Sequence, residues 1–335
     1  MALPANIAIN GFGRIGRNFF RLLINHPDYN VVAINDVADA ETLTHLLKYD
    51  SIHGKLSEEV IGVNSTITIK DKSTAVLNYS HPRDIPWDKY DVDYVVECSG
   101  RFKSTKDLRE HLKPGVKKIV LSVPPDDPAI KMVVLGVNEH ILDGTERIIS
   151  NASCTTNNAA PMLKLIHENF VVDQAYITTV HSFTSDQSLH DQPHRDLRRG
   201  RAATQSIIPT TTGAAKALTY IFPDLNKVIG GCGIRVPVPN GSLTDMTLNI
   251  EKETTIQQVN EVFRAASETN LKGILNYTED PMVSVDILGN SASCVFDSQM
   301  TSVIGGKMVK LIGWYDNETG YSNRLLDLIA MINDK

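Results

Sequence analysis

The stretch Gly11-Phe12-Gly13-Arg14-Ile15-Gly16 decides the fold of the first part of the chain. An apolar run at residues 7–10 precedes it and a helical pattern at residues 17–25 follows, so the glycines connect an expected strand to an expected helix. In such a turn the first glycine permits the sharp bend, the second lets backbone approach a pyrophosphate, and the third allows close helix–strand packing. The helix N-terminus then offers free N–H groups to the phosphates. The sequence therefore predicts a dinucleotide site on Gly11, Gly13 and Gly16.

Asp36 supports this interpretation, because it ends the next strand-like run, at residues 31–35, twenty residues after Gly16. A carboxylate at this place accepts hydrogen bonds from both ribose hydroxyls of NAD and repels the 2′-phosphate of NADP. The alternative is a glycine turn with an unrelated surface aspartate. The motif, its context and the spacing together favour an NAD site.

Around this motif, the first 150 residues alternate strand-like and helical patterns, which predicts a parallel sheet covered by helices on both faces. Further strand-like runs and one helical pattern lie at residues 93–98, 119–122, 132–135, 148–149 and 106–112. From about residue 170, longer runs alternate polar and apolar residues, as at 175–180 and 242–250, which is typical of an antiparallel sheet with one buried face. A helix at 256–266 is expected to cover that face, and a last strand (308–314) and helix (321–332) follow. We therefore expect an α/β Rossmann-type domain followed by an α+β domain with a mainly antiparallel sheet.

The composition excludes several classes of protein. The chain has 33 Lys and Arg against 39 Asp and Glu, so its formal charge of −6 disfavours nucleic acid as the principal partner. No apolar stretch approaches the roughly 18 residues of a membrane span, and the amino end lacks the pattern of a signal peptide. The four cysteines are scattered without a CxxC pair, so we expect no metal site or disulfide framework, and a cytoplasmic protein.

Cys154 is the candidate nucleophile, because Ser153-Cys154-Thr155-Thr156-Asn157 follows an apolar run and precedes a helical pattern. At a helix N-terminus, the helix dipole and neighbouring amides favour the thiolate over the thiol. The nearby hydroxyl residues can cap the helix or bind an anion. The other three cysteines lie in strand-like surroundings and are interpreted as small buried hydrophobic residues.

His181 is the candidate base among ten histidines, because it ends the strand-like run Tyr176-Ile177-Thr178-Thr179-Val180. Residues at the ends of strands project into ligand crevices. His181 can form an ion pair with Cys154 and then accept and return protons. Spacing alone leaves a purely structural histidine equally open.

Several motifs occur in the order of one known family across essentially the whole chain. They are Ala8-Ile9-Asn10-Gly11-Phe12-Gly13-Arg14-Ile15-Gly16-Arg17, Ala152-Ser153-Cys154-Thr155-Thr156-Asn157, Thr179-Val180-His181-Ser182, Asp196-Leu197-Arg198-Arg199, Ile207-Ile208-Pro209-Thr210-Thr211-Thr212-Gly213-Ala214-Ala215, Arg235-Val236-Pro237 and Trp314-Tyr315-Asp316-Asn317-Glu318. With these motifs the chain resembles the phosphorylating glyceraldehyde-3-phosphate dehydrogenases. The resemblance implies oxidation of D-glyceraldehyde 3-phosphate with NAD and inorganic phosphate to 1,3-bisphosphoglycerate in glycolysis. It also implies a hemithioacetal and then a thioester on Cys154, with His181 as base.

The resemblance further implies which residues bind the ligands and how the chain is organised. The implied cofactor contacts are Gly11, Gly13, Arg14, Ile15, Gly16, Asp36, Ser122 and Asn317. The implied substrate and phosphate contacts are Ser153, Thr155, Thr184, Arg199, Thr212, Gly213 and Arg235, of which Thr184 and Arg235 match the pocket for the substrate's own phosphate. The implied domains are an NAD-binding domain at 1–152, completed by a C-terminal helix at 318–335, and a catalytic domain at 153–317. Residues 182–201 correspond to a loop that packs at the cofactor site of a neighbouring subunit in a homotetramer.

Three alternatives remain at this point. Erythrose-4-phosphate dehydrogenases share the Cys/His pair but usually depart at the positions of Thr184 and Thr212-Gly213, which this chain keeps. An aspartate-semialdehyde-type dehydrogenase does not account for the motifs after residue 207, and a catalytically silent NAD-binding protein does not account for Cys154 with His181. Asn158, Thr319, Ser80 and Gln192 depart from common family residues, and the last three leave contacts near the cofactor open.

Overall fold

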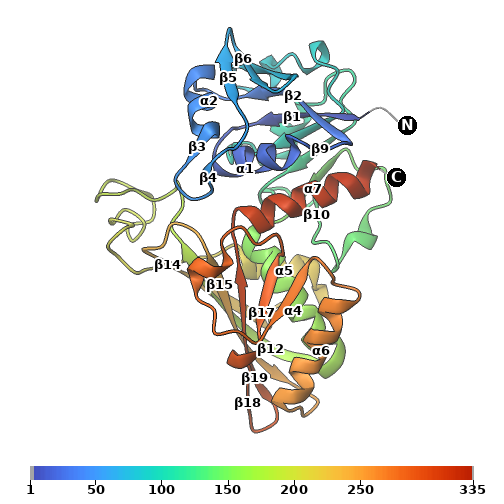
Figure 1. Cartoon of the computed structure of the whole chain (residues 1–335). Coiled ribbons are helices and arrows are strands. Elements are labelled where there is room, and N and C mark those ends of the chain that lie inside the picture. The colour runs from blue at the N-terminus through green and yellow to red at the C-terminus, as the bar shows by residue number, and fades with distance from the viewer. Residues whose placement is uncertain (1–3, 334–335) are drawn as a thin grey trace. The chain divides into compact units, whose positions relative to one another are not determined.

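The computed structural model describes residues 4–333, which divide into two compact units (Figure 1). The first unit contains residues 4–133, 140–152 and 322–333 of the described chain. The second unit contains Val134–Glu139 and Ser153–Tyr321. Residues 1–3 of the amino end considered above, and residues 334–335 of the predicted segment 318–335, lie outside the described residues.

The first unit is built on a nine-stranded sheet in the order β10-β11-β9-β8-β1-β2-β7-β6-β5. Neighbouring strands from β10 to β7 are parallel, whereas β7, β6 and β5 pair in antiparallel fashion. The central strands are apolar and buried without alternation, as expected for strands covered on both faces. The strands are β1 (Ala5–Asn10), β2 (Tyr29–Asn35), β5 (Val60–Val63), β6 (Thr66–Ile69), β7 (Lys72–Leu77), β8 (Tyr94–Glu97), β9 (Lys118–Leu121), β10 (Lys131–Met132) and β11 (Ile148–Ser150).

The helices of this unit follow the strands, as crossover connections require. They are α1 (Arg14–Leu23), α2 (Ala40–Lys48), α3 (Thr105–Arg109) and, from Ser322 onward, α7 (Thr319–Asn333), with the 3₁₀ turns η1 (Pro82–Asp84), η2 (Trp87–Lys89) and η3 (Glu139–Ile141) and the short pair β3 (Tyr49–Asp50) and β4 (Gly54–Lys55). Helix α1 begins directly after Gly13, so the glycine turn joins β1 to the N-terminus of α1.

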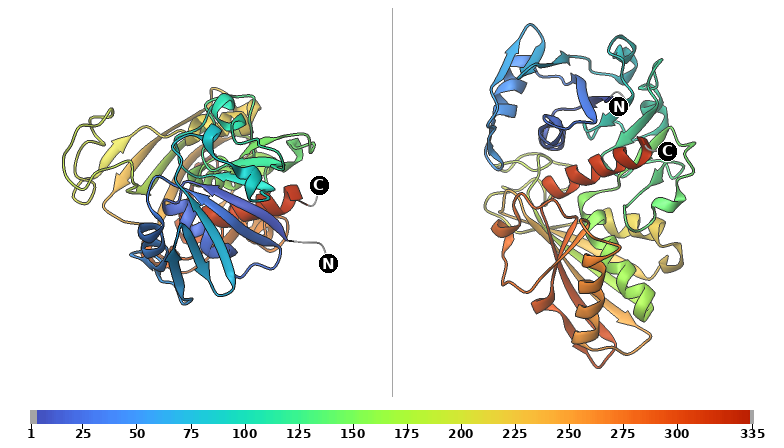
Figure 2. Two further views of the ribbon diagram at one scale, coloured as in Figure 1. Left: turned by 90° about the horizontal axis from the view of Figure 1, so that it is seen from above. Right: turned by 45° about the vertical axis from the view of Figure 1, so that its right-hand side comes forward.

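The second unit contains an eight-stranded mixed sheet in the order β13-β14-β12-β15-β19-β17-β16, with β18 paired to β19. Only β12 with β14 and β16 with β17 are parallel among its described pairs. Helix α4 packs on the central strands, α5 on β14 and α6 on β16 (Figures 1 and 2). The elements are α4 (Cys154–Phe170), β12 (Val172–Ser182), β13 (Ile208–Thr210), α5 (Ala214–Ile221), η4 (Pro223–Leu225), β14 (Ile229–Val236), β15 (Ser242–Ile250), α6 (Ile256–Glu268), β16 (Leu275–Thr278), η5 (Ser284–Ile287), β17 (Cys294–Asp297), η6 (Ser298–Met300), β18 (Ser302–Ile304) and β19 (Met308–Tyr315).

The structure confirms the predicted fold class, and β15 keeps its predicted bounds with strictly alternating burial. The strand expected at 132–135 is wrong beyond Met132, because β10 ends there and the chain enters a turn. Helix α2 and strands β5 to β7 have no counterpart among the predicted elements. No helix within residues 4–333 is long and apolar enough to cross a membrane.

Candidate active site

The glycine turn of the first unit has the geometry that its three glycines predict. Gly11 has φ +91°, and a Cβ on it would lie 2.4 Å from the backbone nitrogen of Ser99. A Cβ on Gly16 would lie 2.2 Å from the carbonyl oxygen of Gly11. A Cβ on Gly13 would meet nothing within 4 Å, so the space beside Gly13 is open. Two glycines are therefore required by packing, and Gly13 leaves room for a ligand.

A hollow of about 210 Å³ lies over this turn within the first unit. It is lined by Asn10, Gly11, Gly13, Asn35, Asp36, Val37, Tyr79, Ser80, Cys98, Ser99, Arg101 and Phe102. Asp36 is fixed there, because Oδ2 accepts a 2.7 Å hydrogen bond from Phe12 N and Oδ1 accepts one of 3.1 Å from Ala38 N. The open Gly13, the uncapped N-terminus of α1 and the acceptor carboxylate fit a dinucleotide with a free ribose hydroxyl pair.

A buried polar network that is not evident from the sequence holds the floor of this hollow. The Glu97 carboxylate accepts hydrogen bonds from Ser99 N at 2.7 Å, Asn10 Nδ2 at 2.5 Å and His111 Nε2 at 3.1 Å. Trp87 Nε1 donates to His111 Nδ1 at 3.0 Å, which places the ring proton on Nε2. Glu97, His111 and Trp87 are all fully buried, so this network fixes Asn10 and Ser99 beside the glycine turn.

The other predicted cofactor residues of the first unit lie near the same strand ends. Arg14 forms a two-bond pair with Asp50, at 2.5 and 3.1 Å. Burial alone would raise the pKa of Asp50, but the bonds from Arg14 and from backbone N–H groups hold it well below its usual range. Ile15 is partly buried in the first turn of α1, and Ser122 is buried after β9, where its N donates to Glu97 O.

In the second unit, Cys154 is the first residue of α4. Ser153 is the N-cap, and its Oγ accepts a 3.1 Å hydrogen bond from Thr156 N. Ala152, directly before the cap, has φ +54°, a strained left-handed conformation for a residue with a Cβ. The strained residue and the cap together fix the point at which the helix starts, and so the place of the sulfur.

His181 lies beside this sulfur, as predicted. Its Nε2 is 3.5 Å from Cys154 Sγ, and the side chain is 5% exposed. It lies near the end of β12, where the parallel register with β14 places it opposite Arg235. The structure thus brings together Cys154, His181 and Arg235 from a helix and two paired strands.

The other ring nitrogen of His181 has two neighbours. Nδ1 lies 2.7 Å from the carbonyl oxygen of Ser182 and 2.7 Å from Arg235 Nη1, which also donates to that carbonyl at 2.8 Å. If Nδ1 carries the proton, it donates to Ser182 O and leaves Nε2 free to accept a proton from the thiol. If Nδ1 accepts from Arg235, the proton is on Nε2 and faces the sulfur.

In this structure Cys154 and His181 are both favoured in their neutral forms, and not as the predicted thiolate–imidazolium ion pair. Burial raises the pKa of the Cys154 thiol, although the charge of Arg235 and the backbone amides of α4 oppose the rise. Burial, followed by the charge of Arg235, lowers the pKa of His181 to about 3. Both shifts favour a thiol beside a neutral imidazole while Arg235 lies at Nδ1.

A second guanidinium, Arg199, lies on the loop before β13, and its charge also acts on His181. Its Nη1 is 2.6 Å from Asp186 Oδ2, and its Nε donates to Thr210 Oγ1 at 3.0 Å. Arg199 and Arg235 thus supply two positive charges that act on His181, and Asp186 pairs with Arg199.

The other residues predicted to bind phosphate or substrate are Thr155, Thr184, Thr212 and Gly213, and three of them already take part in hydrogen bonds within the protein. Thr155 Oγ1 is buried and lies 2.9 Å from Tyr315 Oη, so this hydroxyl already has a protein partner. Thr212 Oγ1 accepts from Ala214 N at 3.2 Å, which caps α5, and Gly213 is exposed at the N-cap position. Thr184 is half-buried shortly after β12, and its carbonyl accepts from Gln187 N.

Tyr315 is a site residue that the sequence analysis does not single out. Its Oη lies 2.9 Å from both Thr155 Oγ1 and Thr179 Oγ1, and its ring meets the His181 ring edge-on at 5.9 Å. Burial raises the pKa of Tyr315. The Trp-Tyr-Asp-Asn motif contains this residue, but only the folded register of β19 shows that it packs against the base.

Asn317, the last predicted cofactor contact, follows β19 and is 6% exposed. Its Oδ1 accepts hydrogen bonds of 2.9 Å from Ser182 Oγ and from Ser242 Oγ. The neighbouring Asp316 carboxylate accepts from Asn240 Nδ2, Glu318 N and Thr319 N. This buried turn fixes Asn317 in the same unit as the thiol.

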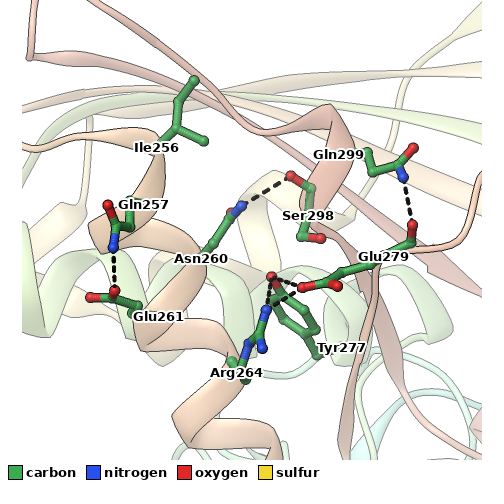
Figure 3. A pocket seen from close by; sticks show the side chains of 9 residues that line it. All are labelled: Ile256, Gln257, Asn260, Glu261, Arg264, Tyr277, Glu279, Ser298 and Gln299. Atoms are coloured by element: carbon green, nitrogen blue, oxygen red, sulfur yellow. Dashed lines mark hydrogen bonds and ion pairs between the residues drawn. The ribbon is translucent and has the colours of Figure 1, made fainter.

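A larger hollow of about 780 Å³ lies elsewhere on the second unit (Figure 3). It is lined by Ile256, Gln257, Asn260, Glu261, Arg264, Tyr277, Glu279, Ser298 and Gln299. Arg264 pairs with Glu279 and stacks on Tyr277 at 4.8 Å (Figure 3). The one remaining carboxylate of the lining, Glu261, accepts a 2.9 Å hydrogen bond from Gln257 Nε2, and the lining holds neither cysteine nor histidine. Among residues 4–333, no cluster of three or more His, Cys, Asp or Glu side chains could hold a metal.

Comparison with known proteins adds the family. The family model described as glyceraldehyde 3-phosphate dehydrogenase, NAD binding domain, matches residues 5–105, and the C-terminal domain of the same family matches residues 153–317. A relative named glyceraldehyde-3-phosphate dehydrogenase from Streptomyces coelicolor is 50% identical over 99% of this chain and 100% of its own length. The relative of that name from Geobacillus stearothermophilus is 48% identical over 99% of both chains. The chain therefore belongs to the glyceraldehyde-3-phosphate dehydrogenase family.

Proposed function

We propose that this protein oxidises D-glyceraldehyde 3-phosphate to 1,3-bisphosphoglycerate with NAD and inorganic phosphate. The observation that carries the proposal is Cys154 Sγ at the N-terminus of α4, 3.5 Å from His181 Nε2, with two arginines beside the pair. A buried thiol, a base and two guanidiniums suit acyl transfer to an oxyanion. The family membership gives the aldehyde, and the Thr184 and Thr212-Gly213 positions favour the triose over the erythrose phosphate.

The first-unit hollow is the proposed site of NAD. Gly11, Gly13, Arg14, Ile15 and Gly16 would hold the pyrophosphate on backbone amides at the start of α1. The Asp36 carboxylate would accept the ribose hydroxyls, and Ser122 and Asn317 would contact the nicotinamide portion. NAD, when bound, accepts the hydride that leaves the substrate.

Cys154 and His181 would carry the covalent steps. The sulfur attacks the aldehyde carbon as the C=O π bond opens, and the S–H proton passes through His181 Nε2 to the aldehyde oxygen, which gives a hemithioacetal with a new hydroxyl. His181 Nε2 accepts the proton of the new hydroxyl as the C–H hydride departs, which leaves a thioester on the sulfur. An oxygen of inorganic phosphate then attacks the acyl carbon, the C–S bond breaks, and the acyl phosphate leaves. A thioester keeps the energy of oxidation that hydrolysis of the same acyl group would lose.

Two oxyanions must be held during this sequence, and the arginines are suited to both. Arg235, with Thr184, would take the phosphate of the substrate, and Arg199, Thr212, Gly213, Ser153 and Thr155 would hold the attacking phosphate or the substrate. Engagement of Arg235 by a phosphate draws its guanidinium toward the anion and away from Nδ1 of His181. This change favours the tautomer with Nδ1–H donated to Ser182 O, in which Nε2 can accept a proton.

Three broader features belong to the same proposal. We place the functional domain boundaries at 1–152 with 318–335 and at 153–317; the match of the C-terminal family model to residues 153–317 supports the second of these segments. We propose a homotetramer in which residues 182–201 complete a neighbouring subunit's cofactor site. We also propose a cytoplasmic enzyme, in keeping with four free cysteines.

Steady-state kinetics test the proposal. The expected result is a higher kcat/KM with glyceraldehyde 3-phosphate than with erythrose 4-phosphate, a requirement for inorganic phosphate, and a preference for NAD over NADP. Cys154→Ser should remove the activity, while Cys232→Ser, a partly buried cysteine on β14, should retain it. Equal use of both aldehydes, or activity without Cys154, would contradict the proposed reaction.

A further inference from the structure

A row of hydrogen-bonded polar groups crosses the carboxyl ends of four neighbouring strands of the first sheet. In the order β8-β1-β2-β7, the strand ends Glu97, Asn10 and Asn35 are direct register partners, and Tyr79 follows β7 by two residues. Asn10 Nδ2 donates to Glu97 Oε2 at 2.5 Å, and Asn35 Nδ2 donates to Asn10 Oδ1 at 2.7 Å. Asn35 also donates to Tyr79 O at 3.0 Å and accepts from Tyr79 N at 2.9 Å.

The row continues from Glu97 to Ser99, which follows β8. Ser99 N and Ser99 Oγ both donate to Glu97 Oε1, at 2.7 and 2.5 Å. Residues 79–80 after β7 and residues 98–102 after β8 both line the hollow of the first unit, and β1 and β2 lie between these two walls. The row therefore joins the two walls, and we call it the polar belt; its members are Tyr79, Asn35, Asn10, Glu97 and Ser99.

The two ends of the belt determine the orientation of both asparagine amides. The backbone N–H of Tyr79 donates and its carbonyl accepts, so Asn35 must direct Oδ1 to the former and Nδ2 to the latter. At the other end the Glu97 carboxylate can only accept, so Asn10 must direct Nδ2 to it. The remaining pair, Asn35 Nδ2 and Asn10 Oδ1, then meets as donor and acceptor. All three side chains are at most 3% exposed, so a lost hydrogen bond would leave a buried polar group unsatisfied.

We propose that Glu97 is a positioning residue for the adenosine half of NAD, because its carboxylate sets the direction of the polar belt and the belt holds the two walls of the hollow together. This inference rests on the proposed placement of NAD, in which Asp36 accepts the hydroxyls of the adenosine ribose. Glu97 is fully buried and does not line the hollow, so its effect on the cofactor passes through the other members of the belt.

Glu97→Gln tests the carboxylate, because glutamine has nearly the same shape. One carboxylate oxygen of Glu97 faces Ser99 N, and the other faces Asn10 Nδ2 and His111 Nε2, all of which donate. Whichever way a glutamine is turned, its N–H₂ group meets a donor at one of these two places. If Asn10 turns over in response, its N–H₂ group meets the donor Asn35 Nδ2, so the mismatch moves along the belt.

Amide hydrogen exchange of the free protein, resolved by NMR, is the first readout. In Glu97→Gln, exchange should become faster at both Ser99 N and Tyr79 N, although a chain of three hydrogen bonds separates Tyr79 from the substituted residue. In Asn35→Ala, Tyr79 N should exchange faster and Ser99 N should keep its wild-type rate. Asn18→Ala is the matched control, because Asn18 is also a buried asparagine of the first unit and lies on α1, outside the belt.

The second readout is the dissociation constant of AMP, measured by calorimetry, because AMP contains the adenosine half of NAD without the nicotinamide. Both belt variants should raise it about 2- to 12-fold, the effect of one lost hydrogen bond, and Asn18→Ala should leave it near wild type. The KM for NAD should rise by a similar factor. The kcat at saturating NAD, triose phosphate and phosphate should stay near wild type, since Cys154 and His181 belong to the second unit.

Two results would overturn the inference. One is faster exchange at Ser99 N alone in Glu97→Gln, since Glu97 would then support only the wall next to it. The other is a dissociation constant for AMP that stays at the control value in the belt variants. Should Glu97→Gln fail to fold, the same unchanged constant in Asn35→Ala would suffice. A wild-type protein that binds NAD and AMP but does not oxidise the triose phosphate would instead contradict the proposed function, and the exchange and AMP readouts would still apply.

Discussion

Cys154 differs from the other cysteines in what surrounds its sulfur, although all four are free. Burial raises the pKa of Cys98 to about 12 despite a hydrogen bond from Ser122, and burial also raises the pKa of Cys294; no positive charge among residues 4–333 acts on either thiol. At Cys154 the same burial is opposed by Arg235 and by the amides of α4. At the residue scale, we therefore expect Cys154, at the N-terminus of a helix, to be more reactive than Cys98 and Cys294.

This difference predicts selective alkylation by iodoacetamide. Cys154 should be modified first near neutral pH, and its rate should rise with pH, because burial keeps part of the population in the thiol form at lower pH. His181→Asn should slow the reaction roughly tenfold, since Asn cannot accept the proton. Mass spectrometry of the labelled peptides gives the rates.

His140→Asn, an exposed histidine on η3, is the control and should label like wild type. Equal, slow labelling of all four cysteines would show that the Cys154 environment does not activate the thiol.

Asp36 sets a second prediction at this scale, on cofactor choice. Asp36→Ala removes the acceptor for ribose hydroxyls and the bond to Phe12 N, so kcat/KM for NAD should fall. The loss for NADP should be smaller, because the repulsion of the 2′-phosphate is removed as well. Asp71→Asn, at an exposed position of the same unit, should leave the NAD-to-NADP ratio unchanged. A ratio unaffected by Asp36→Ala would mean that another group selects the cofactor.

At the scale of elements, two glycines in the turn from β1 to α1 have different roles: Gly16 is needed for packing, and Gly13 is expected to be needed for ligand binding. Gly16→Ala places a Cβ 2.2 Å from Gly11 O and should lower the free energy of unfolding by roughly 1–3 kcal/mol. Gly13→Ala meets nothing within 4 Å, so the melting temperature should stay near wild type while NAD binding weakens. Thermal melts and calorimetry with NAD measure the two effects. Tight NAD binding by Gly13→Ala would show that the pyrophosphate does not approach this glycine.

The N-terminus of helix α6 allows a prediction about stability at a place that does not belong to the candidate active site. Thr255 and Gln258 form a capping box at its N-terminus, with Thr255 Oγ1 accepting from Gln258 N at 3.2 Å. Thr255→Ala should cost about 1 kcal/mol in the free energy of unfolding, measured by urea denaturation. The kcat should not change, since neither residue contacts the thiol or its partners. A change in kcat would instead indicate that α6 communicates with the site.

Local sequence patterns predict those elements whose residues follow from a single strand face or a single backbone requirement. The alternation in β15 and the glycine turn before α1 are visible in the sequence, because each follows from one strand face or one backbone requirement. The proximity of Cys154 to His181 could only be hypothesised, since it depends on how α4 packs on the sheet. Glu97 and His111 are 14 residues apart in the sequence, and Ser182 and Asn317 are 135 apart. No local sequence pattern predicts that these side chains form hydrogen bonds with one another.

At the scale of the whole molecule, the second sheet has a hollowed surface that includes residues of β12, β14, β15 and β19. On it lies a hollow of about 410 Å³ whose lining includes Tyr176, Thr247, Asn249 and Met308. Tyr176 is 53% exposed, and Leu197, within the 182–201 segment, is 85% exposed. We take each of these exposed apolar side chains as a candidate contact in the proposed homotetramer.

This surface leads to a prediction on oligomeric state. Sedimentation velocity should show a tetramer, and Tyr176→Asp should shift the population toward smaller species, because a buried charge would oppose association. Val63→Asp, on β5 of the first unit, is also a change at an exposed apolar position and should leave the tetramer intact. A monomeric wild-type protein would contradict the proposed assembly.

The burial of α4 has a consequence for how the protein ages. The helix is enclosed along most of its length, so its amide hydrogens should exchange with solvent only when the second unit opens as a whole. The sulfur at its first residue would then lose its neighbours in the same event. On heating, disappearance of the rapidly titrated thiol should therefore follow the same curve as deuterium uptake by α4, so that a simple chemical titration reports how much folded protein remains.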